Sequence, residues 1–490
     1  MLLKDIISKP NIIDIKGDLN KEVLDVVYHS SKVTKGTVFV AVTGFGVDGH
    51  VFISEAINKG AVAIVCEKDI NVDNVCVIKV ANARRALAEL SASFFGDPSN
   101  QLSLIGITGT NGKTTITYLL ESIFNKAGLK PGVIGTVEHR FGNKKIISVN
   151  TTPESYDFQK LLRQMVDDGV KVCISEVSSH ALELDRVKGS HFDAAVFTNL
   201  TTEHMDFHKD IESYFNSKKK LFYEVLKDSG KDKTFSVINI DDNFGKKIAD
   251  EITHKLFRYS ISSKSEVKAE NVICDDKGVR FKVITPLGSF DLRSDLIGRF
   301  NVYNILAATS AAIGMGVSIE NIRAGIADLK SVPGRFERVE NNHNVLAFVD
   351  YAHTPDAIKN LLMNARDLAN TSGGRLIMVF GCGGDRDRSK RPLMGEEASS
   401  LADIVFVTSD NPRTENPDVI IEDIVSGIDK ENFTIIADRK LAITTAVEIS
   451  NKNDVLVVAG KGHEDYQIIG QEKKHFSDRK ILKQCFDNKK

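Results

Sequence analysis

The 490-residue chain lacks several features that mark particular classes of protein. It has no run of about 18 apolar residues, so no segment is predicted to span a membrane. Met1 to Asp5 opens without the apolar stretch of a secretory signal. The six cysteines lie far apart with no C-x-x-C pair, which argues against a disulfide framework or a zinc site. We therefore expect reduced thiols and a cytoplasmic protein.

The chain also lacks a charge excess of either sign. Its 64 basic and 66 acidic residues give a formal net charge of −2. This balance leaves no basic footprint for nucleic acid and no polybasic membrane signal. Lys218 to Lys220 is the most basic short run, and it is too short for a nucleic-acid-binding tail. We find no internal repeat or low-complexity tract and expect small-molecule partners.

The length predicts about three domains. Clusters of turn-forming residues at Gly96–Asn100 and Lys330–Gly334 suggest the boundaries. The predicted domains are therefore residues 1–97, 98–331 and 332–490. Apolar strands alternate with helical stretches in all three ranges, which predicts an α/β fold with largely parallel sheets.

The expected elements are short apolar runs and one strongly periodic helix. The helix is expected at Thr114–Ala127, ended by Gly128 and Pro131. The expected strands are Thr37–Val42, Val62–Cys66, Leu104–Thr108, Val172–Val177, Ala194–Leu200, Ser236–Ile240, Leu346–Asp350, Leu376–Gly381, Ile404–Thr408, Thr434–Ala437 and Val455–Ala459.

The stretch Gly106–Thr115, GITGTNGKTT, has the context of a phosphate-binding loop but departs from the strict G-x-x-x-x-G-K-[ST] pattern. Ile107 stands where that pattern has glycine, and we expect it to finish the strand. A glycine-rich turn between a buried strand and a helix points backbone N–H groups and the helix dipole at a phosphate. Lys113 can reach phosphate oxygens and Thr114 can bind Mg²⁺. The loop predicts use of ATP.

Three further residues could carry chemistry. Glu176 ends a predicted strand, where a carboxylate could bind Mg²⁺ or cap a neighbouring helix. His204 is unusual for a magnesium site and is equally compatible with a structural role. Lys218, taken alone, is typical of a solvated helix face.

Three polar loops follow predicted strands near the C-terminus. They begin at Gly381, Ser409 and Gly460. Ligands of parallel sheets bind beyond the carboxyl ends of the strands. We therefore expect these loops to form one binding rim.

Taken together, these motifs resemble the Mur ligase family, cytoplasmic enzymes of peptidoglycan synthesis. The resemblance extends from about residue 25 to the C-terminus, and the family's loop form T-G-T-N-G-K-T is matched in full. The matching segments are Thr108–Thr115, Glu176–His180, Asn199–Asp206, Tyr214–Phe222 and Asp350–Asp356.

The resemblance implies three domains: a small N-terminal α/β uridine-binding domain, a central P-loop-type ATPase domain and a C-terminal Rossmann-like domain. It implies an ATP-dependent ligase, acting as a monomer, that activates a carboxylate as an acyl phosphate before an amine attacks. Lys113, Glu176, His204 and Lys218 would be catalytic. The ATP contacts would be Gly109, Thr110, Asn111, Gly112, Lys113, Thr114, Thr115, Asn304, Arg335, Asp350 and His353.

The resemblance also implies two Mg²⁺ ions. Thr114 and Glu176 would hold one, and His204 with a carbamylated Lys218 would help to hold the other. Lys218 would then supply a carboxylate in place of an ammonium. The ions and Lys113 would neutralise the repulsion between phosphate and carboxylate.

Within the family, the chain is most similar to members that add a diamino acid to UDP-MurNAc-L-Ala-D-Glu. Asp410-Asn411-Pro412-Arg413 resembles the motif for meso-diaminopimelate, whose second carboxylate a guanidinium can bind. Lysine ends in an ammonium, which Arg413 would repel. The other matches for diaminopimelate are Arg386, Gly460 and Glu464. Those for the UDP-sugar peptide are Ser30, Thr151, Thr152, Ser178 and Arg186.

The first domain departs from the family, because His29-Ser30-Ser31 replaces the usual Asp-Ser-Arg. Gly44 to Gly49 still falls where a uridine-binding turn is expected. The alternatives are a lysine-adding or D-Ala-D-Ala-adding ligase, folylpolyglutamate synthase, or a silent nucleotide-binding regulator. A Rossmann dehydrogenase is disfavoured, because no G-x-G-x-x-G lies between a strand and a helix.

Overall fold

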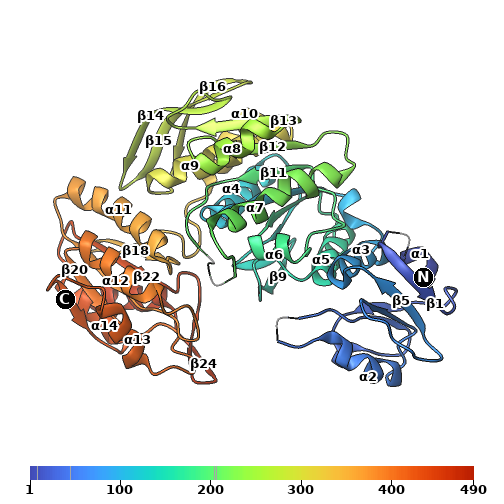
Figure 1. Cartoon of the computed structure of the whole chain (residues 1–490). Helices are drawn as coiled ribbons and strands as arrows, with labels where there is room; N and C mark the ends of the chain where they lie inside the picture. The colour runs from blue at the N-terminus through green and yellow to red at the C-terminus, as the bar shows by residue number, and fades with distance from the viewer. Residues whose placement is uncertain (8, 45, 204, 206, 490) are drawn as a thin grey trace.

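Three main sheets follow one another along the chain, one in each predicted range (Figure 1). The computed structural model describes all residues except 8, 45, 204, 206 and 490. In Figure 1 the blue N-terminal part lies at the lower right, the central part at the top and the orange-red C-terminal part at the left. The expected three-part α/β architecture is confirmed, while the domain boundaries at 97/98 and 331/332 stay predictions.

The N-terminal sheet has five strands in the order β1-β5-β4-β3-β2. Its strands are parallel except β1, which pairs antiparallel with β5. The strands are β1 (Ile12–Lys16), β2 (Asp25–Val27), β3 (Thr37–Val40), β4 (Ala63–Cys66) and β5 (Cys76–Val80). The helices are α1 (Leu3–Ile6), α2 (Ile53–Asn58) and α3 (Ala83–Phe94), with the short 3-10 turns η1 (Ser30–Lys32), η2 (Gly49–Phe52) and η3 (Pro98–Asn100).

The central sheet has eleven strands in the order β16-β15-β14-β13-β12-β11-β6-β10-β7-β8-β9. Its middle is parallel, and antiparallel strands extend both edges. The strands are β6 (Ser103–Thr108), β7 (Pro131–Ile134), β8 (Glu138–Phe141), β9 (Lys144–Ile147), β10 (Val172–Glu176), β11 (Ala194–Phe197), β12 (Phe235–Asn239), β13 (Lys255–Ser260), β14 (Val267–Asp275), β15 (Gly278–Thr285) and β16 (Gly288–Ser294).

Helices cover both faces of this sheet, as a parallel sheet requires. On one face α4 packs with α9 and α10, and a core cluster there includes Ile105 and Ile107. Leu104, which points the other way, belongs to a second cluster. The helices are α4 (Lys113–Lys126), α5 (Ser155–Asp167), α6 (Ser179–Glu183), α7 (Ile211–Lys220), η4 (Leu221–Val225, one π turn), η5 (Lys227–Ser229, 3-10), α8 (Asn243–Glu251), α9 (Arg299–Gly314) and α10 (Ile319–Asp328).

The C-terminal sheet has the order β17-β18-β22-β19-β20-β21 and is parallel except for β17. Its strands are β17 (Glu337–Val339), β18 (Leu346–Asp350), β19 (Leu376–Phe380), β20 (Ile404–Val407), β21 (Phe433–Ile435) and β22 (Val455–Ala459), followed by the hairpin β23 (Tyr466–Ile469) and β24 (Glu472–His475). The helices are α11 (Pro355–Ser372), α12 (Lys390–Leu401), α13 (Pro417–Val425), α14 (Arg439–Ile449) and α15 (Asp478–Asn488).

The predicted strands and the predicted helix agree with the structure to within three residues at every end. Thr114–Ala127 is helical from Lys113 to Lys126, and Leu346–Asp350 and Val455–Ala459 are strands with those bounds. The prediction found β3, β4, β6, β10 to β12 and β18 to β22, and it missed the other strands. In β9, β14 and β16, exposed positions interrupt the apolar runs by which the parallel strands were found.

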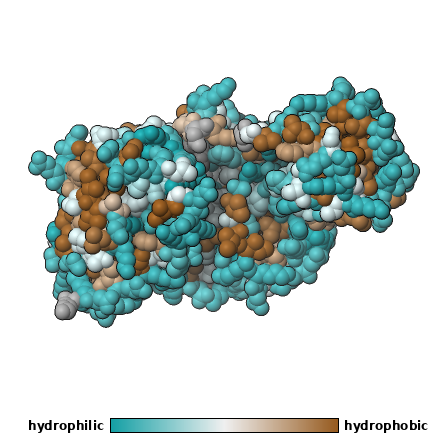
Figure 2. All heavy atoms as spheres, turned by 90° about the horizontal axis from the view of Figure 1, so that it is seen from below, coloured by the Kyte–Doolittle hydropathy of each residue, from teal (hydrophilic) through white to brown (hydrophobic). Residues whose placement is uncertain are grey.

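The surface seen from below carries hydrophobic residues in several separate groups, with hydrophilic residues over most of the rest (Figure 2). Among the residues that the structure describes, no helix is both long and apolar enough to cross a membrane.

Candidate functional site

The glycine-rich loop joins β6 to α4, and two of its glycines are required by their surroundings. Gly109 has φ +141° and Gly112 has φ +94°, a region that side-chain-bearing residues rarely adopt. A Cβ atom on Gly109 would lie 1.8 Å from Thr198 Oγ1, and one on Gly112 would lie 2.3 Å from Asn304 Oδ1. The predicted ATP residue Asn304 therefore lies directly against the loop.

The loop is held in place by the segment after β11. Asn199 accepts hydrogen bonds from the N–H groups of Thr110 through its carbonyl (2.8 Å) and of Asn111 through its side chain (2.9 Å). Thr198 Oγ1 donates to the carbonyl of Asn111 at 2.7 Å. These three hydrogen bonds hold the loop against the segment that follows β11.

Two lysines converge on one carbonyl of this loop. Lys113 Nζ donates to the carbonyls of Gly109 (2.7 Å) and Thr110 (2.8 Å), and Lys218 Nζ donates to that of Gly109 at 2.9 Å. Lys218 is 1% exposed, so the interpretation as a solvated lysine is wrong. Burial, followed by the nearby charge of Lys113, lowers the pKa of Lys218 far below its usual value. This environment favours the neutral, reactive amine.

Glu176 ends β10 beside the loop. Because β10 and β6 are parallel neighbours with Glu176 paired to Ile107, both strands end at the same edge of the sheet. The carboxylate accepts hydrogen bonds from Thr114 Oγ1 (3.1 Å) and from Thr136, through its N–H and its Oγ1 (both 2.9 Å). It does not cap the following helix, since Ser178 does so.

Thr114 and Glu176 together present a hydroxyl and a carboxylate at one point. These are hard oxygen donors of the kind that Mg²⁺ binds together with phosphate and water. In the described part of the chain, no group of three or more His, Cys, Asp or Glu side chains could hold a metal. A magnesium ion bound by these two side chains would take its other ligands from water or from phosphate oxygens. His204, the predicted ligand of a second ion, lies outside the described residues.

Arg335 connects this point to the C-terminal part of the chain. Its Nη2 donates to Thr114 Oγ1 at 3.2 Å, and its guanidinium lies 4.8 Å from the centre of the Tyr351 ring. Its Nε atom is buried without a hydrogen-bond partner. Asp350 accepts hydrogen bonds from the N–H groups of Phe336 and Ala352, at 2.6 and 2.7 Å. The exposed His353 instead bonds to the carbonyl of Tyr351.

The predicted UDP-sugar contacts in the central domain are linked to Glu176. Thr152 Oγ1 donates to the carbonyl of Glu176 at 2.9 Å and accepts from the N–H of Ser178 at 3.1 Å. Arg186 donates to the carbonyl of Thr152 at 3.1 Å, and Thr151 Oγ1 lies 3.1 Å from Thr136 Oγ1. Thr152 is fully buried, so its hydroxyl serves this network and not the surface. Ser30 begins η1 in the N-terminal domain.

The C-terminal rim contains a buried polar cluster. Lys461 is fully buried and donates to Asn411 Oδ1 at 2.9 Å, and Asn411 Nδ2 donates to Glu464 at 3.0 Å. Lys461 also pairs with Asp410 at 3.6 Å. A Cβ atom on Gly460 would lie 2.6 Å from Asp410 Oδ2. The structure thus brings the predicted residues Asp410, Asn411, Gly460 and Glu464 together.

Arg413 stands on the same rim in an unusual conformation. It has φ +52°, which costs a residue with a side chain some strain. Its main chain bonds to Ile468 and Gly470 of the β23–β24 hairpin, and its Nη1 donates to the carbonyl of Gly384 at 2.6 Å. This contact brings Arg413 to the loop that carries the exposed Arg386. The rim predicted from three loops therefore also includes this hairpin.

Sequence reasoning missed five residues of these clusters: Thr136, Thr198, Tyr351, Lys461 and His463. Lys461 and His463 lie in the polar loop that begins at Gly460, but nothing in the sequence indicated a partner for either side chain. Partial burial lowers the pKa of His463 to about 4, and its ring lies 5.2 Å from that of Tyr351. Thr136 follows the short strand β7, and no polar motif in that part of the sequence marks it as a site residue.

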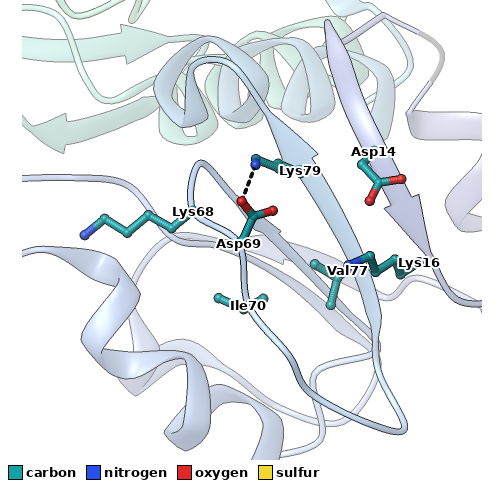
Figure 3. Close-up of a pocket in the computed structure, with 7 residues that line it drawn as sticks. All are labelled: Asp14, Lys16, Lys68, Asp69, Ile70, Val77 and Lys79. Atoms are coloured by element: carbon teal, nitrogen blue, oxygen red, sulfur yellow. Dashed lines mark hydrogen bonds and ion pairs between the residues drawn. The ribbon is translucent and has the colours of Figure 1, made fainter.

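Two surface hollows lie at the N-terminal part of the chain. The pocket in Figure 3 lies in the N-terminal domain, where Asp69 pairs with Lys79 at 2.7 Å. Its volume of about 10 Å³ is room for about one water. A second cavity, of about 190 Å³, lies between β2 and the start of α5.

Comparisons with known proteins find related chains over the full length. Three family models match: "Mur ligase family, catalytic domain" at residues 23–95, "Mur ligase middle domain" at 107–312 and "Mur ligase, glutamate ligase domain" at 334–462. The chain is 45% identical over 470 residues to UDP-N-acetylmuramoyl-L-alanyl-D-glutamate–2,6-diaminopimelate ligase of Clostridium botulinum, covering 95% of both. The enzyme of the same name from Clostridium tetani is 44% identical over 493 residues, covering 99% of both.

Solved structures give the same picture. A 2,6-diaminopimelate ligase with the same printed name has a TM-score of 0.72 and 31% identity, with 99% of both chains covered. The MurF ligase of Thermotoga maritima, in complex with ADP, has a TM-score of 0.62 at 20% identity, covering 96% of this chain and 98% of that one. The second likeness concerns the fold alone.

The contact between Gly112 and Asn304 yields a testable prediction. Gly112→Ala should weaken ATP binding about tenfold or more, because the new methyl group meets Asn304 and overpacks the cradle. Isothermal titration calorimetry measures the change. Gly128→Ala is the matched control, since Gly128 also has a positive φ (+73°) but faces open space. If both variants bind ATP equally well, the loop does not depend on this contact.

Proposed function

Because the chain belongs to the Mur ligase family, we propose that it is an ATP-dependent ligase that adds meso-2,6-diaminopimelate to UDP-MurNAc-L-Ala-D-Glu. The bond formed is an amide at the γ-carboxylate of D-Glu, a step in cytoplasmic peptidoglycan precursor synthesis. One observation carries the proposal. The hydroxyl of Thr114 is hydrogen-bonded both to Glu176 and to Arg335, so the three side chains lie at one point. The glycine-rich loop, the carboxylate of Glu176 and the C-terminal part of the chain thus contribute to one centre.

In the first step an oxygen of the γ-carboxylate attacks the γ-phosphorus of ATP, and ADP leaves. The loop N–H groups and Lys113 would bind the phosphates, for which Lys113 must turn away from the carbonyls of Gly109 and Thr110. Arg335 would add a positive charge beside Thr114. Mg²⁺ bound at Thr114 and Glu176 would supply further charge neutralisation between the two anions.

In the second step the amine of diaminopimelate attacks the acyl carbon, phosphate leaves and the nitrogen loses a proton. Lys218 supports this step if its neutral amine has combined with CO₂ to give a carbamate. The remaining N–H could keep its hydrogen bond to the Gly109 carbonyl, while the new carboxylate would be a hard ligand for a second Mg²⁺. His204 is proposed as the other ligand of this second ion, and this proposal rests on the Asn199–Asp206 motif alone.

The C-terminal rim accounts for the choice of amino acid. Diaminopimelate carries a carboxylate at its far end, which Arg413 and Arg386 can bind as charged donors. Glu464, oriented by Asn411, can accept the ammonium beside it. The strained backbone of Arg413 and its ties to the β23–β24 hairpin fix the guanidinium, which reduces the entropy lost on binding.

The alternatives fit this rim less well. A lysine-adding ligase would place an ammonium where Arg413 offers a positive charge. A silent regulator would not need Lys113, Glu176 and Lys218 in contact with one loop. Action as a monomer on small molecules in the cytoplasm is part of the proposal.

Substrate preference tests the proposed function. ADP release with UDP-MurNAc-L-Ala-D-Glu should be much faster with meso-diaminopimelate than with L-lysine. Arg413→Ala should raise KM for diaminopimelate about 10- to 100-fold, the cost of lost hydrogen bonds to a charged group. KM for ATP should change little. Arg388→Ala, which removes an exposed arginine paired with Asp423, is the control. Equal turnover of lysine would refute the specificity, and absence of turnover with either amino acid would favour the regulator.

Chemical rescue tests the role of Lys218. Lys218→Ala should lower kcat about a hundredfold or more, because a charge-stabilising group is lost from the reacting centre. Added acetate or formate should restore part of the activity by replacing the carboxylate. Lys219→Ala, which removes the neighbouring lysine paired with Glu251, should behave as wild type. Failure of every small carboxylic acid to restore activity argues against the carbamate.

A further inference from the structure

The N-terminal and central domains are joined by two hydrogen bonds that run in opposite directions, with one donor on each domain. Tyr28, just after β2, donates through its hydroxyl to Asp157 Oδ2 at 2.8 Å. In the opposite direction, Tyr156 donates to Asp25 Oδ1 at 2.9 Å. Each domain therefore supplies one tyrosine and one aspartate. We call these four residues the crossed pair.

The surroundings of the crossed pair make it an ordered contact. Tyr156 is 6% exposed and belongs to the hydrophobic core of the N-terminal domain, although it lies in the first turn of α5. Its ring lies 5.4 Å from that of Phe95, at the end of α3. Figure 1 shows α3 and α5 side by side where the two domains meet, and the two helices are in contact. Burial, followed by the charge of Asp157, raises the pKa of Tyr28, so its hydroxyl stays protonated and donates.

Two hydrogen bonds at separate points restrict the relative orientation of two domains more than one hydrogen bond does. A single contact leaves two domains free to rotate about it, whereas two contacts and a buried ring fix their relative orientation. Asp25 is itself oriented, because its Oδ1 also accepts the N–H of Val26 at 2.8 Å. A second link lies nearby: Arg84 of α3 pairs at 3.2 Å with Glu154, the residue that caps α5.

The crossed pair lies close in sequence to both halves of the proposed UDP-sugar site. Tyr28 precedes Ser30 by two residues, and Tyr156 follows Thr152 by four. Thr152 is bonded to the carbonyl of Glu176, at the end of β10. The crossed pair thus lies between the segment that carries Ser30 and the segment that is bonded to Glu176.

We propose that Tyr28, Asp157, Tyr156 and Asp25 are positioning residues for the UDP-sugar substrate. By fixing the orientation of the N-terminal domain, they hold Ser30 and its neighbours at the distance from Glu176 that the substrate must span. The inference rests on the proposed function.

Tyrosine-to-phenylalanine variants test this inference, because they remove the hydroxyls and keep the rings. Tyr28→Phe and Tyr156→Phe should each raise KM for UDP-MurNAc-L-Ala-D-Glu about three- to tenfold, the effect of one lost hydrogen bond. The double variant should raise it further, with kcat and KM for ATP within about twofold of wild type. Asp157→Asn keeps an acceptor and should retain more substrate affinity than Asp157→Leu.

Tyr223→Phe is the matched control, since its hydroxyl donates to the Ile248 carbonyl within the central domain. KM for the UDP substrate should then stay at the wild-type value. An unchanged KM in the double variant, or an equal rise in KM for ATP, overturns the inference.

Hydrogen exchange without substrate separates this inference from the proposed function. In the double variant the amides of Asp25 to Tyr28 and of the first turn of α5 should exchange faster, and in Tyr223→Phe they should not. Wild-type protein that never turns over the UDP substrate contradicts the proposed function. In that case unchanged exchange in the double variant also refutes the crossed pair as a link between the domains, and faster exchange supports it.

Discussion

Thr114 Oγ1 donates a hydrogen bond to Glu176 Oε2 where the phosphate loop meets the end of the neighbouring strand. The proposed reaction must bring a phosphate and a carboxylate together at this point, although both are negative. Two negative groups about 4 Å apart repel each other strongly unless a polar medium or a countercharge lies between them. Lys113, the buried Lys218 and Arg335 lie around this point, and the parallel pairing of β6 with β10 brings the loop and Glu176 together.

Two hydrogen-bonded contacts connect this centre to the other two domains. Arg335 links it to the C-terminal sheet, whose loops carry Arg413 and Glu464. Thr152 links it to α5 and, through the crossed pair, to the N-terminal sheet. The substrate is long, with uridine at one end and a reacting carboxylate at the other. The contacts proposed for it lie in all three domains, and the hydrogen bonds between the domains would hold these contacts at fixed distances from one another.

Local signals predicted most of the buried parallel strands, the α4 helix and the phosphate loop, because backbone geometry and apolar periodicity are encoded within a few residues. The departure at Ile107 has a simple reason: Ile107 is a buried residue of β6. Contacts between distant segments could not be predicted in this way. Arg335 meets Thr114 across 221 positions and Tyr28 meets Asp157 across 129, and no pattern in either segment names its partner. The role of His204 stays a prediction, as do the magnesium sites and the carbamate.

The central claim is that the carboxylate of D-Glu passes through an acyl phosphate, and oxygen labelling tests it most directly. UDP-MurNAc-L-Ala-D-Glu with both γ-carboxylate oxygens replaced by ¹⁸O is converted with ATP and diaminopimelate, and the released phosphate is examined by mass spectrometry. Our account predicts one ¹⁸O atom in each phosphate and one in the amide, because the carboxylate oxygen that attacks phosphorus leaves with it. Unlabelled phosphate would contradict the account.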